Sequence, residues 1–588
     1  MLFRSNDHYR TGANLNETIL NTSNVNYSEF GLLFSLPVDN PIVTQTLYAP
    51  GVSVKNVLHN VVYISTTGGS VYAYDADQSG PPLWVDHFAA ATPGVKWSIE
   101  STPVIDPATN TLYVVARDTS LITREFKLHA LDLSTGAEKF NGPAVLSGTY
   151  TANGHTLNFS NLSGSQNLKS HAGLALANGQ VIICFSTSNE GPGISYNGWV
   201  LSYNAATLQP TAAFASIISP PAVGGGIWQA GRAPVVDDNG YIYLFVGNTY
   251  NPINYKAAAN GYDGTGNFSE SLLKLDSKLN LIDWFTPGAW ANLDNNDMDL
   301  SSSGPTLIEG TGLLTGAGKD GNLYVWNTNN LGHYNATDAQ VVQKMPAPNN
   351  NQRVMNGVVF WRRTTEQGGS LLFNVYNNSP IFSLVFNNPK LNPTPVSSSS
   401  VSEAINSGKH NSVALSANGG NPGTGIIWEL QNNAITNASV LRAMDAENLG
   451  NELWNSSTYL SDNLQGGTTY IPPTVSNGKV YAPTLDSQLV VYGLKSQLFS
   501  VTQLANQTAA LNSGVSLQIN ASAGGDTLAY AATGLPAGLK INPKSGLISG
   551  SPTAIGNYLI VVTVTDSNTN RQVTMKFSWT ILRGIIKS

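Results

Sequence analysis

Apolar and polar side chains alternate in short runs along the first 494 residues, and many of these runs end at an Asp or Asn. The stretch VYAYDADQSGPPLW, residues 71–84, shows the pattern: an alternating run, Asp75, then Gly80 and Trp84. Alternation with a period of two is typical of a half-buried strand. A short acid or amide at the end of such a run bonds to its own backbone in a turn. The pattern therefore predicts strand–turn–strand units.

The same unit recurs along the chain. Its turn markers are Asp75, Asp132, Asn204, Asp276, Asn327 and Asp445, and neighbouring units are roughly 50 to 70 residues long. Repeats of four strands and about 40–50 residues are typical of β-propeller blades. We count eight units between residues 40 and 494, with seven as the alternative because the unit at 341–387 is degenerate. The prediction is an all-β chain with an eight-bladed, or else seven-bladed, propeller.

The two ends of the repeat region each carry part of a unit. Residues 30–37, FGLLFSLP, form a strand-like run with no unit before it, and 480–494 end without a closing strand. We expect these parts to join in one sheet, with Leu33 and Phe34 beside Val490, so that the ring has no open edge. Residues 1–29 are rich in Asn and are expected to lie as an arm along the propeller surface. The propeller is therefore predicted to span residues 30–494.

The pattern changes after residue 494. Residues 495–582 have short alternating runs separated by the turn clusters GLPAG, NPKSG and SPTAIG, and residues 583–588 are a tail without a pattern. Regular turns between short strands favour a small β-sandwich of Ig-like type.

Composition narrows the function. Only 11% of residues are charged, the net charge is −7 and no basic run exists, which disfavours nucleic acid binding. No apolar stretch approaches the length of a membrane span. Cys184 is the only cysteine, so neither an internal disulfide nor a CxxCH haem attachment is available. The N-terminus lacks the apolar core of a signal peptide, yet the composition favours an exported bacterial protein: secreted, periplasmic or at the cell surface.

Candidate site residues lead into the first strand of each unit. In a propeller these positions converge on one mouth of the central channel. They are Gln45, Glu100, His171, Gln229, Arg232, Asp297, Asp299, Asn356, His410, Asn411 and Thr468, with Trp228 as an aromatic floor. Either these side chains only hydrate the channel and satisfy loop backbone, or they bind a polar ligand or Ca²⁺.

Several segments resemble a known family. ALDLSTGAEKF, residues 130–140, is similar to the A-x-D-x-x-T-G-x-x-x-W repeat of bacterial PQQ-binding-like, quinoprotein-type β-propellers, with Phe140 in place of Trp. Residues 10–20, 224–234, 297–305 and 470–484 resemble a subgroup of exported propellers. The C-terminal segment resembles the Ig, cadherin-like modules of bacterial surface proteins.

The quinoprotein resemblance implies a PQQ- and Ca²⁺-dependent dehydrogenase of alcohols or sugars as one hypothesis. Asp299 and Glu100 would then be catalytic, and Glu100, Asp297 and Asp299 would bind Ca²⁺. The implied cofactor-binding residues are Trp228, Gln229, Arg232, His171, His410 and Asn411. With no vicinal cysteines and no haem site, the electrons would need an external acceptor.

The favoured hypothesis is an exported binding protein for a glycan, a peptide or a surface partner, with no catalytic motif. It depends on the low charge, the appended Ig-like domain and long insertions in units three and four, where repeat proteins place recognition. An extracellular scaffold component is the third hypothesis.

Overall fold

The structure is a computed structural model. It describes residues 3–88, 97–118, 125–159, 168–187, 190–347, 353–377, 379–402, 411–432, 439–495, 499–523, 527–567 and 572–583. The chain forms two compact units, the first made of Met1–Ser28 and Phe34–Tyr492 and the second of Glu29–Leu33 and Gly493–Ser588. Strands dominate both units, and the one α-helix in the described ranges is α1 (Trp290–Asn295). The predicted all-β class is confirmed.

The predicted turn chemistry is present at every marker residue. Strand β5 (Ser70–Asp75) ends at Asp75, whose Oδ1 accepts a hydrogen bond from the Asp77 N–H at 2.8 Å. The other five markers accept a hydrogen bond from the backbone N–H two residues on: Asp132, Asn204, Asp276, Asn327 and Asp445. Each bond satisfies a donor at the tip of a hairpin, so the next strand starts at a fixed angle.

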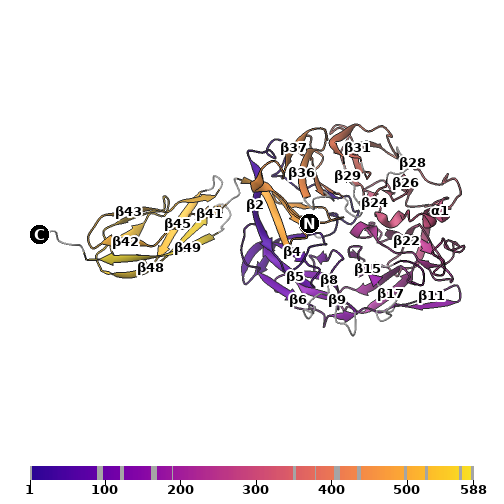
Figure 1. Cartoon of the computed structure of the whole chain (residues 1–588), viewed down its shortest axis with the longest axis horizontal. Coiled ribbons are helices and arrows are strands. Elements are labelled where there is room, and N and C mark those ends of the chain that lie inside the picture. The colour runs from indigo at the N-terminus through magenta and orange to yellow at the C-terminus, as the bar shows by residue number, and fades with distance from the viewer. Residues whose placement is uncertain are drawn as a thin grey trace. The chain divides into compact units, whose positions relative to one another are not determined.

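The first unit is a β-propeller. In Figure 1 its sheets follow one another around a ring in chain order, from indigo through magenta to orange. The first sheet contains β3 (Leu47–Val54), β4 (Val57–Ser65), β5 and β6 (Trp84–His87), and the second contains β7 (Val104–Asp106), β8 (Thr111–Arg117), β9 (Phe126–Asp132) and β10 (Ala144–Val145). The third contains β13 (Leu168–Lys169), β14 (Ala175–Ala177), β15 (Gln180–Thr187), β16 (Trp199–Asn204) and β17 (Pro210–Ala215). The fourth contains β19 (Val235–Val236), β20 (Ile242–Phe245), β22 (Leu272–Leu275), β23 (Leu281–Thr286) and β27 (His333–Tyr334).

Three further sheets continue the ring. The fifth sheet contains β24 (Thr306–Ile308), β25 (Leu313–Ala317), β26 (Leu323–Asn327) and β28 (Gln343–Met345). The sixth contains β29 (Val359–Trp361), β30 (Leu371–Val375), β31 (Pro380–Asn387), β32 (Lys390–Leu391) and β33 (Ser397–Ser402). The seventh contains β34 (Ser412–Ser416), β35 (Ile426–Asn432), β36 (Ser439–Asp445) and β37 (Glu452–Asn455), with β1 (Ala13–Asn14) from the N-terminal segment added. The degenerate repeat at 341–387 thus contributes β29, β30 and β31 to a sheet of its own.

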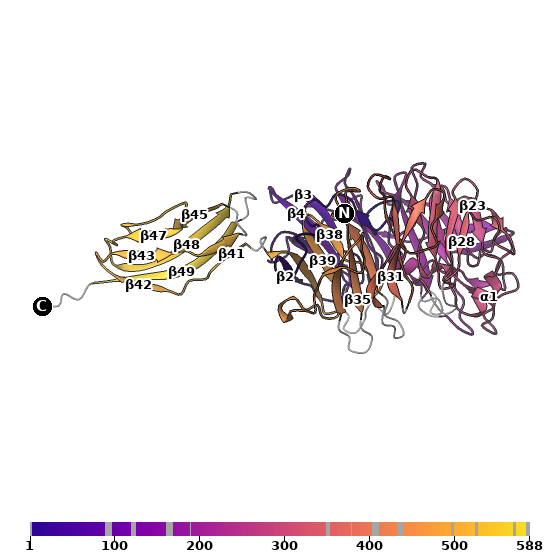
Figure 2. The ribbon, with the colours of Figure 1, turned by 90° about the horizontal axis from the view of Figure 1, so that it is seen from above.

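The last sheet combines strands from distant parts of the chain. It runs in the order β2 (Phe30–Pro37), β40 (Gln488–Leu494), β39 (Lys479–Pro483) and β38 (Thr474–Ser476). Leu36 is fully buried there and packs with Tyr481, Leu489 and Val491. In Figure 2 the labels of β2, β39 and β38 lie in the same part of the propeller, and β40 lies between β2 and β39 in the sheet. Pairing of these two segments leaves no gap between the first and last sheets.

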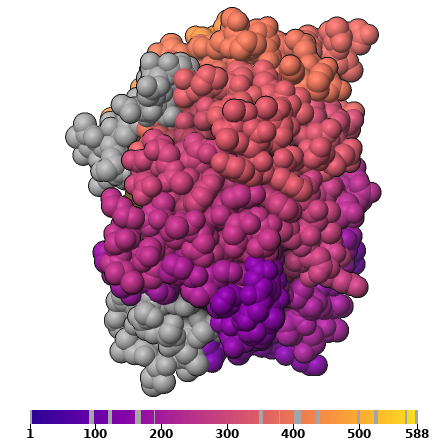
Figure 3. Space-filling view, turned by 90° about the vertical axis from the view of Figure 1, so that its right-hand side faces the viewer, coloured from indigo at the N-terminus to yellow at the C-terminus, as the bar shows by residue number. Residues whose placement is uncertain are grey.

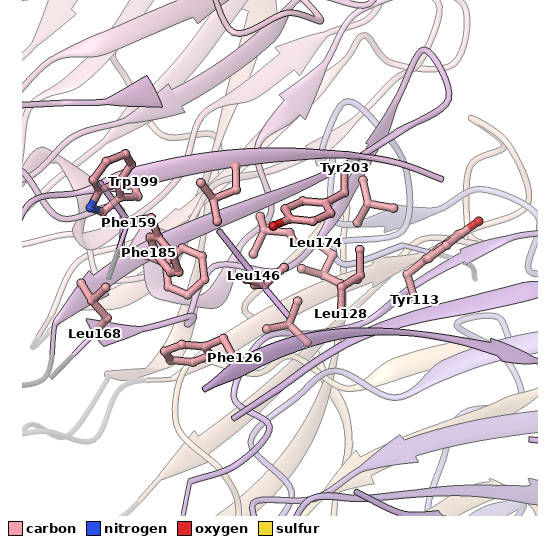
Figure 4. Packing of buried hydrophobic residues seen from close by; sticks show 14 of the residues in the cluster. Tyr113, Phe126, Leu128, Leu146, Phe159, Leu168, Leu174, Phe185, Trp199 and Tyr203 are labelled. Carbon is pink, nitrogen blue, oxygen red and sulfur yellow. The ribbon is translucent and has the colours of Figure 1, made fainter. Parts of the chain in front are cut away.

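Apolar side chains fill the space between neighbouring sheets. Figure 4 shows one such layer, in which Phe126 and Leu128 from β9 meet Phe185 from β15 and Trp199 from β16. The Phe126 and Phe185 rings are edge to face, with centroids 5.0 Å apart. Cys184 is fully buried on β15, and burial raises the pKa of its thiol, as expected for a thiol that only fills the core.

The N-terminal segment corrects one expectation. It was predicted to lie along the surface, but Arg4, Ser5 and Arg10 are almost fully buried, and the N-terminal label stands inside the ring in Figure 1. The segment bonds in turn to the inner strands of four sheets. Carbonyls of His8, Tyr9, Thr11 and Gly12 accept from the N–H groups of Val236, Leu307, Phe360 and Leu415. The central channel is therefore filled by the protein's own chain, because this backbone finds partners on several blades at once.

Two insertions extend the blades outward. The first contains the hairpin β11 (Thr149–Ala152) and β12 (His155–Asn158), and purple atoms mark this part of the chain on the rim in Figure 3. The second, residues 248–271, includes β21 (Thr249–Tyr250), which pairs with β18 (Val223–Gly224).

The second unit is a β-sandwich. One sheet contains β42 (Gln507–Ala510), β49 (Gln572–Leu582), β48 (Gly556–Asp566) and β45 (Leu528–Thr533), and another contains β43 (Val515–Gln518), β47 (Leu547–Gly550) and β46 (Leu539–Ile541). A short pair is formed by β41 (Phe499–Val501) and β44 (Ala521–Ala523). Ile548, Val562, Phe577 and Trp579 are among its core residues.

Candidate functional site

A cavity of about 250 Å³ lies where segments leading into the inner strands of several blades meet, and we call it the mouth pocket. Its lining residues are Lys169, His171, Glu190, Trp228, Ala230, Asp297, Asp299, Ser302, Lys319, Met355 and Tyr470. Four of the predicted site residues are therefore brought together: His171, Trp228, Asp297 and Asp299. The volume is close to the lower end of the range for small-molecule sites, about 300–1,000 Å³.

One wall of the mouth pocket is aromatic. The His171 ring lies edge to face with Trp228, at 5.8 Å between centroids, and with Tyr470, at 6.2 Å. Burial, followed by the nearby cations Lys169 and Arg4, lowers the pKa of His171 well below its usual value. His171 is thus neutral at pH 7, and its Nδ1 is buried with no partner among the described residues. A neutral imidazole beside Trp228 offers both a ring face and a polar atom to a ligand.

A second wall is acidic and holds one lysine. Lys319 Nζ is paired with Asp299 and lies 2.9 Å from Asp297 Oδ1. Asp299 also accepts a hydrogen bond from the Asn248 N–H at 3.1 Å. Although burial lowers the pKa of Lys319, the two aspartates raise it above its usual value. This lysine therefore stays charged and holds both carboxylates in place.

Glu190 adds a third carboxyl group to this wall. Burial and repulsion by Asp299 raise its pKa to about 7, although Tyr196 donates a hydrogen bond to it. Tyr255, from the second insertion, lies close to Glu190. Burial first, and then the charge of Glu190, raise the pKa of the Tyr255 hydroxyl to about 12. The insertion thus adjoins the acidic wall.

Replacement of Glu190 by Gln is expected to flatten the pH dependence of stability. The raised pKa means that the folded state takes up a proton between about pH 4.5 and 7, so this carboxyl destabilises the fold as pH rises through that window. Relative to wild type, the free energy of unfolding of Glu190→Gln should be about 1–2 kcal/mol more favourable to the folded state at pH 8 than at pH 5. Urea unfolding at both pH values measures the difference, and an unchanged pH profile would contradict the assignment.

Two more carboxyl groups are buried behind the acidic wall. Burial and the charges of Asp299 and Asp294 raise the pKa of Glu270 well above its usual value, and Leu300 N–H donates to it. Burial raises the pKa of Asp294 to about 7, and Thr249 donates to both of its oxygens. Asp294 therefore holds the second insertion onto the blade rather than facing the mouth pocket.

Glu100 does not join the acidic wall. It pairs with Lys169, with Nζ 2.7 Å from Oε1, and burial raises its pKa. Lys169 also lies over two rings, 5.2 Å from the Trp97 centroid and 5.8 Å from the Trp228 centroid. Glu100 therefore orients Lys169 at the aromatic wall and contributes indirectly to the mouth pocket.

Other predicted residues serve the fold. Gln229 is fully buried, donates to the Arg232 carbonyl at 3.1 Å and accepts from the Phe245 N–H at 2.9 Å. Arg232 bonds to Val358, Thr306 and Arg10 beside the N-terminal segment. Asn411 is fully buried and donates to Glu429. His410 lies outside the described residues.

Gln45, Asn356 and Thr468 do not line the mouth pocket either. Gln45 Oε1 accepts from the Ser5 N–H at 2.9 Å, and the carbonyl of Thr468 accepts from Asn432. Asn356 faces a second, small cavity beside Arg4 and Arg232. The ring of polar residues that the sequence suggested is therefore divided among the mouth pocket, a second cavity and buried hydrogen bonds of the fold.

The predicted calcium set of Glu100, Asp297 and Asp299 does not fit a shared metal ion in this structure. Each of these carboxylates has an ammonium partner, Lys169 or Lys319. In the part of the chain that the structure describes, no group of three or more His, Cys, Asp or Glu side chains is arranged to hold a metal. Glu190 and Asp299 are a different pair of neighbouring carboxyl groups with oxygen ligands of the type that Ca²⁺ prefers.

The site residues predicted from the sequence did not include five lining residues: Lys169, Glu190, Lys319, Met355 and Tyr470. Lys169 stands two residues before His171 in NLKSHAG, so the same leading segment carried both signals. Glu190 and Lys319 instead follow the second strand of their blades, β15 and β25. Those positions return to the same mouth because adjacent strands in a blade are antiparallel.

Comparisons with known proteins agree with the fold. Residues 498–582 match the family described as "Putative Ig domain". A quinohemoprotein alcohol dehydrogenase, ADHIIG from Pseudomonas putida HK5, superimposes with a TM-score of 0.51 and 14% identity over 87% of this chain and 83% of that one. No match was found among curated proteins. At this identity the likeness shows a shared propeller fold.

Two further solved structures are more distant. The computationally designed Ika8 protein has a TM-score of 0.42 at 12% identity, covering 79% of this chain and 99% of that one. The Dos1 propeller has a TM-score of 0.39 at 11% identity, covering 78% of this chain and 95% of that one.

Across the described ranges, no helix has the length and apolar character needed to cross a membrane.

Proposed function

We propose that this protein is a binding protein whose mouth pocket holds a small hydroxyl-rich ligand, such as the end of a glycan. The observation that supports this proposal is the pairing of an aromatic wall, Trp228 with His171, with an acid–lysine wall across one cavity of about 250 Å³. A pocket of this size suits one or two sugar rings better than a peptide or a protein surface.

Each wall supplies one kind of contact to a sugar. Carboxylates of Asp297 and Asp299 accept hydrogen bonds from hydroxyl groups, and Lys319 donates to hydroxyl oxygens. The half-buried Trp228 offers ring carbons against which the apolar face of a sugar packs. Neither wall needs a charged ligand, because Lys319 already compensates much of the acidity.

The Trp228→Ala substitution tests the proposal. Loss of the aromatic wall should weaken binding of a glycan, identified by screening the intact protein on a glycan array, by at least about tenfold. Trp290→Ala is the matched control, because Trp290 is also half-buried but lies on α1 away from the lining residues. Calorimetry on both variants measures the change. Absence of any glycan binding, or equal loss in both variants, would overturn the proposal.

A PQQ- and Ca²⁺-dependent dehydrogenase is the second candidate function. It is favoured by the neighbouring carboxyl groups of Glu190 and Asp299 near Trp228, together with the propeller shared with a quinohemoprotein alcohol dehydrogenase. When bound, such a cofactor would supply oxidation of an alcohol or sugar and would pass electrons to an external acceptor. Because the predicted calcium set does not come together, we derive no catalytic step from it.

The two candidates separate in one titration. Calorimetry of the purified protein with Ca²⁺ and PQQ, alone and together, should give no saturable heat if the binding proposal is correct. Micromolar binding of PQQ that requires Ca²⁺ and disappears in Asp299→Asn, followed by dye reduction with an alcohol or a sugar, would favour the dehydrogenase.

A glycan-binding propeller with an Ig-like domain fits an exported bacterial protein, in which the Ig-like unit spaces or anchors the binding site.

A further inference from the structure

Three arginines gather in the central channel, beside the mouth pocket. Arg4 and Arg10 come from the N-terminal segment and Arg232 from the fourth sheet's leading segment, and at most 5% of each residue is exposed. Asp7 is the carboxyl group whose charge acts on Arg10 and Arg232; it accepts hydrogen bonds from the N–H and hydroxyl of Thr11 and makes no ion pair with the described arginines. The cluster therefore carries more positive charge than its described surroundings neutralise.

The three guanidinium groups are bound mostly by uncharged oxygens. Arg4 donates to the carbonyls of Ala230 and Tyr470, and Arg10 donates to carbonyls of Pro234, Arg4 and Asp7. Burial and the neighbouring arginines lower the pKa of Arg4 to about 9, so it stays a cation at pH 7. Carbonyl dipoles compensate such charges only in part, because they bring no net negative charge.

Several donors in this cluster have no acceptor among the described residues. They are Nε and Nη1 of Arg4, Nη2 of Arg10, Nε of Arg232 and the hydroxyl of Ser412. Arg4, Arg232 and Ser412 line one small cavity with Asn356 and Gly357, and its volume is about 10 Å³. Gly357 is required there, since a Cβ at this position would stand 2.3 Å from the Arg232 guanidinium.

We propose that this cavity binds a monatomic anion, a halide such as chloride, between Arg4, Arg232 and Ser412. The cavity is large enough for one water-sized sphere and too small for phosphate or a carboxylate. All the unpartnered groups that face it are donors, and two of them are cationic. A water molecule would accept from two of these donors but would direct its own hydrogens at cations, whereas a halide accepts from all of them.

The anion would also support the mouth pocket. Arg4 Nη2 donates to the carbonyls of both Ala230 and Tyr470, and these two residues line the mouth pocket as well as the small cavity. Holding Arg4 in place therefore holds the boundary between the two cavities. The anion site stands on the buried donors and is independent of the ligand proposed above.

The experiment uses the full chain in two measurements. Crystals grown in sodium bromide should show an anomalous peak between Arg4, Arg232 and Ser412. In solution, the thermal midpoint should rise by about 1–3 °C for each tenfold increase in chloride or bromide at constant ionic strength, with sodium gluconate as the balancing salt. No anomalous peak, with equal midpoints in gluconate and chloride, would show that water fills the cavity and would overturn the proposal.

A conservative variant tests the site without removing an arginine. Ser412→Ala removes one donor from the anion. The halide concentration needed for the same rise in thermal midpoint should therefore increase about three- to tenfold. Ser383→Ala is the matched control, because its hydroxyl is likewise buried without a described partner but lies on β31 outside the cavity. The control should keep the wild-type halide dependence. An equal response in both variants would overturn the assignment.

Discussion

Replacement of Lys319 by Met is expected to lower the free energy of unfolding by about 3 kcal/mol at pH 8. Lys319 is the ammonium that faces Asp297 and Asp299, and Asp299 in turn repels Glu190 and Glu270. Without the lysine, the carboxyl groups of Asp299, Glu190 and Glu270, which are largely buried, would repel one another with no neighbouring cation to compensate them. Removal of one partner of a buried pair leaves an uncompensated charge, which costs more than the pair itself contributes.

The pH dependence identifies the cause of that loss. Lys319 holds down the raised pKa values of Glu190 and Glu270 in the folded state, so without it both rise further above the unfolded-state values. The folded state then binds more protons, and the destabilisation is relieved as pH falls toward 5. Lys319→Arg keeps the charge and serves as the control. Urea unfolding of both variants at pH 5 and 8 measures the effect. A loss in Lys319→Met that is equal at both pH values would contradict this account.

Truncation of Leu36 to Ala in the closing strand is expected to cost about 2–5 kcal/mol. Leu36 is fully buried among Tyr481, Leu489 and Val491, and it lies on the strand that pairs with β40. Loss of this packing weakens the one sheet that joins the beginning of the propeller to its end. An opened ring would expose the edge of β40, so the variant should also aggregate on heating.

Leu33→Ala is the control for the closing strand. Leu33 is on the same strand but is only half-buried, so its truncation should cost less than about 1.5 kcal/mol. Chemical unfolding of the two variants, with light scattering during a thermal ramp, compares them directly. Equal stability of Leu36→Ala and wild type would show that the closing strand does not hold the ring together.

The local sequence pattern predicted much of the propeller, because its strands and turns depend on residues that are neighbours in the chain. Alternation fixes which side chains of a strand face the core, and all six acid or amide markers make the turn bond that the pattern implied. The turn clusters after residue 494 likewise predicted the Ig-like sandwich, which the match of residues 498–582 confirms. Blade order followed from the repeats, since consecutive units pack side by side.

The candidate site was predicted only in part. Trp228 and Arg232 are four residues apart and were expected to face one mouth. Gln229, Ala230 and Gly231 between them all have positive φ, at 50°, 47° and 75°, and across this bend the two side chains line different cavities. A bend of this kind is not visible in residue types, because Gln and Ala seldom adopt it without tertiary support.

The sequence by itself determined the repeating strands, their turns, the two units and the set of polar residues that lead into the inner strands. Only the tertiary structure decided which of those residues meet. Lys319 neutralises Asp299 although 20 residues separate them, and the N-terminal segment fills the channel through bonds to blades more than 200 residues away. Such pairings depend on the closure of the ring, which brings distant charges within a few ångströms, and no local pattern encodes that distance.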